Sequence, residues 1–244
     1  MATSPAPNPT LSERLRDRRF YLFITILTAA LVFVGFARTF FLNSFFAKLQ
    51  LPSLWVIHGV VFSSWIVILV VQSVLISAKQ TRIHKKLGYA SMAVVALMAY
   101  LGFEMSRQAA QRSFTPPGGP PPTTFFAFQL LGLFVFAAFI GAGYLFRNRA
   151  ETHKRLMVSG TVLILTPAVA RIFLLFSTNL VIIKAFGLQL AVLLACMAYD
   201  YVTRKRLHTP YVSAVVALLA MLPVAGLIGS TRLWVAISHW MTGV

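Results

Sequence analysis

Acidic residues and cysteine are both scarce in this sequence. Its 244 residues include only five aspartates and glutamates, against 22 lysines and arginines, so the formal net charge is +17. So few carboxylates disfavour a carboxylate-driven hydrolase or a proton pump. The single cysteine, Cys196, lies inside an apolar run, which excludes a disulfide framework and is typical of a small buried residue.

Recognisable nucleotide-binding and catalytic motifs are also missing. The sequence contains no Walker loop, no dinucleotide-binding fingerprint, no Cys-x-x-Cys, no His-Glu-x-x-His and no Gly-x-Ser-x-Gly. Charged residues make up 11% of the chain, whereas a soluble domain has about 25%. Hydrophobic residues make up 58%, and the mean hydropathy is +0.79. This composition predicts an all-α polytopic membrane protein.

The apolar residues are grouped into runs of the ~20 residues that a membrane-spanning helix needs. We expect a polar, basic N-terminal tail over 1–19, a transmembrane domain over 20–230, and an interfacial C-terminal tail over 231–244. Within the domain, 107–123 is predicted to be a Pro/Gly-rich outer loop. The seven expected helices, which form one helix plus three hairpins, are 20–42, 52–77, 87–106, 124–146, 156–177, 181–202 and 210–230. Pro167 and Pro223 are expected to kink their helices, which membrane helices tolerate.

The distribution of lysine and arginine predicts the orientation. Fifteen of the 22 fall in the N-terminal tail and in the loops after the second, fourth and sixth runs. By the positive-inside rule these segments are cytoplasmic, so the N-terminus is inside. Because the charges lie in short loops between apolar runs, we expect them to meet anionic lipid headgroups and exclude nucleic acid as a partner.

Histidines mark three of the four basic segments. His84 and His153 are each followed by two basic residues and leucine, and His208 follows a basic triplet. Each begins the returning helix of one expected hairpin, so the first two copies indicate a duplication and the third is a looser copy. All three histidines would lie at the inner face of the membrane.

These inner histidines are candidate cofactor ligands. Imidazoles on neighbouring helices suit axial ligation of haem, with His84 and His153 as ligands and Arg82, Lys86 and Arg155 holding the propionates. Alternatively, neutral imidazoles with a carboxylate suit zinc or iron, and that metal set is His84, His153, His208 and Asp200. A third interpretation gives the histidines no cofactor, because basic side chains at helix ends also reach toward headgroups. Asp200 would then pair with Arg204, one turn away.

A second polar set is predicted near the outer face: Arg38, His58, Glu104 and Arg171. Glu104 follows His84 by twenty residues, which is ~30 Å along a helix, so no single site can hold both sets. Charged residues inside apolar runs are costly and usually face the bundle interior. The simplest expectation is that Glu104 pairs with Arg38 or Arg171. The alternative is an outer pocket with His58 as a cofactor ligand or proton carrier.

Several of these residues also carry a resemblance. The string His58-Gly59, Trp65, Gln72, His84-Lys85-Lys86-Leu87-Gly88, His153-Lys154-Arg155-Leu156-Met157, Arg171, Asp200, Arg204 and His208 resembles an uncharacterised family of bacterial multi-pass membrane proteins with His-(Lys/Arg)-x-Leu repeats. It covers most of residues 55–210. A looser likeness is to transmembrane diheme b-type cytochromes, which also place histidines on paired helices. Here the inner histidines lie at helix starts, and the outer side offers one histidine rather than two.

Three functions remain open at this point. The leading hypothesis is a bacterial inner-membrane protein with a histidine-based cofactor site, b-type haem, that transfers electrons to a redox partner. The second is a metal-dependent membrane enzyme with zinc or iron that acts on a lipid-like substrate. The third is a transporter or assembly protein without chemistry and without a cofactor. A homo-oligomer is compatible with each of the three.

Overall fold

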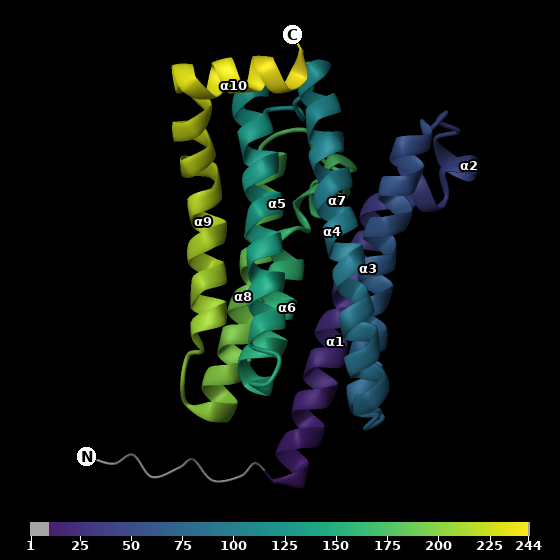
Figure 1. Ribbon diagram of the computed structural model, residues 1–244, viewed down its shortest axis with the longest axis vertical. Coiled ribbons are helices and arrows are strands. Elements are labelled where there is room, and N and C mark those ends of the chain that lie inside the picture. The colour runs from purple at the N-terminus through teal and green to yellow at the C-terminus, as the bar shows by residue number, and fades with distance from the viewer. Residues whose placement is uncertain (1–9, 244) are drawn as a thin grey trace.

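The computed structural model describes residues 10–243, and all regular structure in that part of the chain is helical (Figure 1). The elements are α1 (Leu11–Phe36), a π-helix η1 (Ala37–Phe41), α2 (Asn43–Phe46), α3 (Ser53–Ser77), α4 (Thr81–Gln111), α5 (Pro122–Leu145), α6 (Ala150–Leu163), α7 (Thr166–Leu174), α8 (Val181–Arg204), α9 (Thr209–Gly229) and α10 (Arg232–Thr242).

The protein is a polytopic helical membrane protein. Six helices are long and apolar enough to span a bilayer, counting α1 and η1 as one span, and α6 with α7 makes a seventh that is bent by 42°. The bundle has two ends. We call the basic end the one that carries the start of α1 and the loops 78–80, 146–149 and 205–208, at the lower side of Figure 1. The other end, capped by α10, is the opposite end.

The first helix starts inside the expected N-terminal tail. Thr10 forms a capping box with Glu13: its side chain accepts from the Glu13 amide, and the Glu13 carboxylate accepts from the Thr10 amide. This arrangement satisfies two amides that a helix start leaves free. Residues 11–19 therefore belong to α1, which carries Asp17 into the bundle, while 1–9 lie outside the described residues.

The span formed by α6 and α7 is broken at Ile164–Leu165, two residues before Pro167, which was expected to kink it. Backbone carbonyls freed in an apolar layer need other donors. Gln189 of α8 contributes one: its amide donates to the carbonyls of Val162 and Leu163 at 2.7 and 3.2 Å, and its oxygen accepts from the Thr166 hydroxyl at 3.0 Å. The Val162 carbonyl also accepts from the Leu165 amide at 3.1 Å, so Leu163 is the carbonyl that needs Gln189 most. By contrast, α9 continues through Pro223 as one helix.

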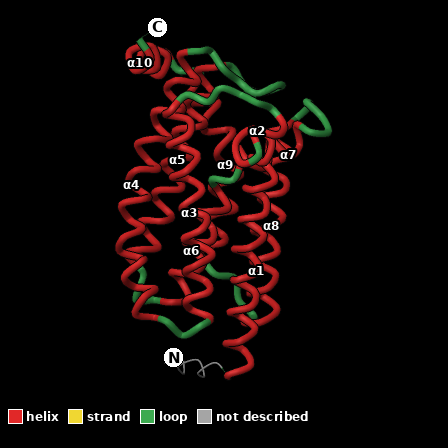
Figure 2. The backbone as a smooth tube through the Cα atoms, turned by 90° about the vertical axis from the view of Figure 1, so that its right-hand side faces the viewer, coloured by secondary structure: helices red, strands yellow, loops and turns green. Residues whose placement is uncertain are grey.

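The broken span lies in the middle of the bundle, against α1, α5, α8 and α9 (Figures 1 and 2). Its close contact with α1 depends on Gly35, where a Cβ atom would lie 2.2 Å from the Ala168 carbonyl oxygen. Small residues let membrane helices approach in this way. The central position of α6 brings its first turn close to the other helices of the basic end.

The C-terminal helix α10 lies across the opposite end, roughly perpendicular to the bundle (Figure 1). Two hydrogen bonds hold it there. The Trp234 indole donates to the Thr123 carbonyl at 2.9 Å, and the Gln111 amide donates to the Thr242 carbonyl at 2.7 Å. The helix α10 therefore covers part of the opposite end of the bundle.

Candidate functional site

The rings of His84 and His153 lie next to each other at the basic end. Their centroids are 6.2 Å apart and their planes are nearly perpendicular, at 87°. Each histidine lies in the first turn of its helix, His84 in α4 and His153 in α6. The two helices are the returning arms of adjacent hairpins, so the duplicated sequence pattern brings the two rings together.

The two rings are held differently. His153 Nδ1 donates to the Gly143 carbonyl of α5 at 2.7 Å, which orients the ring and leaves Nε2 as the nitrogen that could bind a ligand. His84 Nδ1 is buried and has no hydrogen-bond partner. The backbone of His84 is tied to α3, because the Gln72 amide donates to its carbonyl at 3.2 Å. Gln72 Oε1 is likewise buried without a partner, so two polar atoms here are unsatisfied.

A second group at the basic end is centred on Asp200. Its carboxylate accepts two hydrogen bonds from Arg155, at 2.6 Å from Nε and 2.7 Å from Nη2. Neither side chain is exposed. Arg155 Nη1 also donates to the carbonyl and the carboxylate of Glu151. The Arg155 guanidinium is thus fully used, and this is a buried, bidentate ion pair of the kind that arginine forms best.

The ion pair continues toward α1 through Asp17. The Asp17 carboxylate accepts from Lys154 at 2.8 Å, from the Tyr199 hydroxyl at 2.7 Å, and from Arg204. Arg204 also lies 3.2 Å from Glu151. Charged side chains of α1, α6 and α8 therefore form one network, which we call the Asp17–Asp200 network.

His208 completes this network from the loop before α9. Its Nδ1 lies 2.8 Å from Asp200 Oδ2, though not at a good hydrogen-bond angle, and its Nε2 accepts from Arg206 at 3.0 Å. Because Nε2 is an acceptor, the ring is neutral with the proton on Nδ1. Burial, and then the charge of Arg155, lowers the pKa of His208 below its usual range, although Asp200 acts in the other direction.

The structure changes several expected roles. The predicted metal set of His84, His153, His208 and Asp200 is divided into two pairs, and no group of three or more potential metal ligands forms among residues 10–243. Arg155 is not free to hold a propionate, because it is occupied by Asp200 and Glu151. Arg82 and Lys86 are exposed beside His84 and remain available.

The expected pairing of Glu104 was wrong. Its carboxylate binds Arg107, one turn away, at 2.8 Å, rather than Arg38 or Arg171. Arg38 is exposed on η1. His58 is stacked on Phe62 with ring centroids 4.1 Å apart, and Arg171 lies within its electrostatic range. The outer set is therefore divided too, with Glu104 bound to Arg107 and Arg38 exposed.

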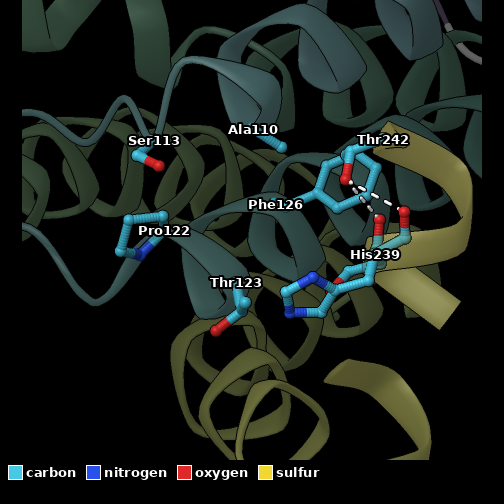
Figure 3. A pocket seen from close by; sticks show the side chains of 8 residues that line it. Ala110, Ser113, Pro122, Thr123, Phe126, His239 and Thr242 are labelled. Atoms are coloured by element: carbon cyan, nitrogen blue, oxygen red, sulfur yellow. Dashed lines mark hydrogen bonds between the residues drawn. The ribbon is translucent and has the colours of Figure 1, made fainter. Parts of the chain in front are cut away.

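A small cavity of about 100 Å³ lies at the opposite end beneath α10. Figure 3 shows its lining, in which Ser113, Thr123, His239 and Thr242 contribute polar groups from the ends of α4, α5 and α10. Thr242 donates to the Ser238 carbonyl at 2.7 Å, so its hydroxyl is already satisfied. The terminal helix α10 forms one wall of this cavity. None of the residues predicted to carry chemistry lines it.

Three important residues were not predicted as members of a site. Asp17 was assigned to the tail, and Glu151 and Gln189 were not singled out. For Asp17 a signal existed, because Thr10 and Glu13 form the sequence pattern of a capping box and so mark an earlier helix start. Gln189 lies inside the apolar helix α8, and an amide in such a helix needs polar partners, which a broken neighbouring helix offers in its backbone.

Comparison of the chain with protein-family models, curated proteins and solved structures gave no match. The function therefore has to be inferred from the geometry of the basic end.

Proposed function

We propose that His84 and His153 are the axial ligands of a b-type haem in a bacterial inner-membrane protein that transfers electrons. The observation that carries this proposal is the pairing of the two imidazoles, 6.2 Å apart, from two helices that return from adjacent hairpins. The resemblance to diheme b-type cytochromes and to bacterial multi-pass proteins with His-(Lys/Arg)-x-Leu repeats is part of the same proposal.

The separation of the rings suits one metal ion between them. An imidazole nitrogen binds a metal at ~2 Å, so two rings on opposite sides of one ion have centroids about 6 Å apart. The bond from His153 Nδ1 to the Gly143 carbonyl is the usual support of a metal-bound histidine, since it orients the ring and makes Nε2 the ligand.

The number of ligands favours haem over a bare ion. A structural or catalytic zinc ion takes three or four protein ligands. In the described residues, no third histidine, cysteine or carboxylate joins His84 and His153. Haem needs only axial ligands from the protein, because the porphyrin supplies its own four nitrogens. The exposed cations Arg82 and Lys86 flank the His84 side and would pair with propionates.

The optical spectrum of the detergent-purified protein tests this proposal. We expect a Soret band, sharp bands on reduction, and iron in a one-to-one ratio to protein. His84→Ala and His153→Ala should each lose the low-spin spectrum. The matched control is His58→Ala, which removes a histidine near the opposite end and should keep it.

A second variant distinguishes loss of the spectrum through loss of a ligand from loss through misfolding. In His153→Met the thioether is still a ligand, so the haem should remain with a shifted reduction potential. Circular dichroism and gel filtration of each variant check that the bundle is intact. A protein that stays colourless after expression with added haem precursor, or a spectrum unchanged in both alanine variants, contradicts the proposal.

A further inference from the structure

Arg171 of α7 has no carboxylate partner in the described chain. Its Nη1 donates to the Pro167 carbonyl at 2.9 Å, and its guanidinium lies 4.4 Å from the centre of the Phe36 ring. The side chain is partly buried. Withdrawing a cation from water is costly unless an anion compensates it, and one carbonyl and one ring do this only in part.

The five acidic residues of the chain are engaged elsewhere. Glu104 binds Arg107, and Glu13 caps the start of α1. Asp17, Glu151 and Asp200 belong to the network at the basic end, across the membrane from Arg171. The acidic side chains of the sequence are therefore all engaged away from Arg171, and an anion that neutralises it is not one of them.

A second polar group with an unsatisfied atom lies at the same end of the bundle. His58 Nδ1 is buried and has no hydrogen-bond partner, the ring meets the Leu101 backbone, and the charge of Arg171 reaches it. The other contacts here are aromatic, since Phe62 stacks on His58 and Phe36 lies under Arg171. A ligand at this place would meet one cation and one imidazole between apolar rings.

The depth of these groups indicates the source of the anion. Arg171 is three residues from the end of α7, and His58 is five residues from the start of α3. Each therefore lies within ~8 Å of the helix terminus that points toward the opposite end of the bundle. This is the depth at which lipid headgroups meet the hydrocarbon layer. The shared chemistry is that of a phosphate, which arginine binds with two parallel N–H groups.

We propose that Arg171 and His58 form a site for the headgroup of an anionic phospholipid in the leaflet at the opposite end. Arg171 binds the phosphate, and His58 Nδ1 forms a hydrogen bond with the polar part of the same headgroup. The acyl chains lie along the apolar surfaces of α3 and η1. The site is separate from the proposed haem and does not depend on it.

The thermal unfolding midpoint of the detergent-purified protein tests this site. Phosphatidylglycerol should raise the midpoint of the unmodified protein by several degrees, through binding to the folded state. Phosphatidylcholine and inorganic phosphate, at the same concentration, should raise it much less. Arg171→Gln should lose most of the phosphatidylglycerol effect. Arg112→Gln, which removes an exposed arginine at the same end, should keep it.

Two further variants serve if Arg171→Gln does not fold. Arg171→Lys keeps the charge without the planar fork and should retain part of the effect. His58→Phe keeps the aromatic shape without the polar atom and should reduce it. Native mass spectrometry counts the lipid retained by each variant, one per chain in the unmodified protein.

The proposal is overturned if Arg171→Gln responds to phosphatidylglycerol as the unmodified protein does. It is also overturned if phosphatidylcholine is as effective, because charge would then not matter. If inorganic phosphate raises the midpoint as much as phosphatidylglycerol does, the ligand of the site is a soluble anion and not a lipid. His84→Ala should bind phosphatidylglycerol normally, so failure of the haem proposal and failure of this one are distinguishable.

Discussion

Arg155 of α6 and Asp200 of α8 are joined by hydrogen bonds of 2.6 and 2.7 Å, and neither side chain has any exposed surface. The two helices are not sequence neighbours, since α7 lies between them. The pair therefore connects the central broken span to the next helix at the basic end. Two charges at this depth stabilise the fold only while both are present.

Removal of one partner should be strongly destabilising. We expect Asp200→Ala to lower the free energy of unfolding by about 3–5 kcal/mol, because the buried Arg155 charge would keep only the half-exposed Glu151 carboxylate as its anion. Thermal or denaturant unfolding in detergent, followed by circular dichroism, measures the loss. Glu104→Gln breaks the more exposed pair with Arg107 and should cost about 1 kcal/mol or less.

The double variant Arg155→Met with Asp200→Leu separates a lost charge pair from a lost contact. Replacing both charges by apolar groups of similar size should recover most of the stability. If Asp200→Ala alone unfolds like the unmodified protein, the ion pair does not hold the basic end together.

The stability should also depend on pH through His208. Its pKa in the folded protein is lowered by burial, below the ordinary value of 6.5 that the unfolded chain would have. The unfolded state therefore binds a proton more readily, and stability falls as the pH drops below about 6.5. We expect the unfolding midpoint to fall between pH 7 and pH 5.

The control for this pH dependence is His208→Gln, which keeps a polar side chain without the titration. In this variant the slope between pH 7 and pH 5 should be smaller than in the unmodified protein. Equal slopes would assign the pH dependence to other groups.

Gly35 should not tolerate a side chain. A Cβ atom at this position would lie 2.2 Å from the backbone oxygen of Ala168 and 2.7 Å from its carbonyl carbon, so α1 and α7 would have to separate. We expect Gly35→Ala to cost about 1–3 kcal/mol or more, as overpacking does. Gly187 on α8 has nothing within 4 Å of its Cβ position, so Gly187→Ala should be neutral or stabilising by about 0.5–1 kcal/mol. The unfolding midpoint of Gly35→Ala should therefore be lower than that of the unmodified protein, and the midpoint of Gly187→Ala should be equal to it or higher.

The predicted orientation can be read by labelling with a membrane-impermeant maleimide in intact cells. The native Cys196 is fully buried and should not react. In a Cys196→Ser background, Ser113→Cys at the opposite end should label from outside the cell. Asn148→Cys in the basic-end loop should label only after the membrane is permeabilised, because basic loops stay in the cytoplasm. The reverse pattern would invert the topology.

The sequence pattern predicted the helical class and the hairpin arrangement well, because both follow from local properties. Apolar runs of spanning length define helices, and basic loops separate the arms of each hairpin. The meeting of His84 and His153 followed from the same repeat, since two similar hairpins placed side by side bring equivalent positions to the same depth.

Only some partners of the charged residues could be predicted in this way. Asp200 was expected to pair with Arg204, one turn away, and the two do lie 3.7 Å apart. Its shortest hydrogen bonds, however, come from Arg155, forty-five positions earlier in the chain. Asp17 of α1 meets Lys154 and Arg204, which follow it by 137 and 187 positions in the chain. Such pairs depend on how whole helices pack. Helical spacing predicts only pairs between residues three or four positions apart on the same helix. The pair of Glu104 with Arg107 is of this kind.

The bond from Gln189 to the broken span also bears on how the protein enters the membrane. The carbonyl of Leu163 obtains its donor from α8, which follows it in the chain. During synthesis this span, the fifth in chain order, therefore emerges before the group that satisfies it. The segment from α6 to α8 then has to leave the translocation machinery as a unit, with its last helix arriving in time to shield the gap in the earlier one.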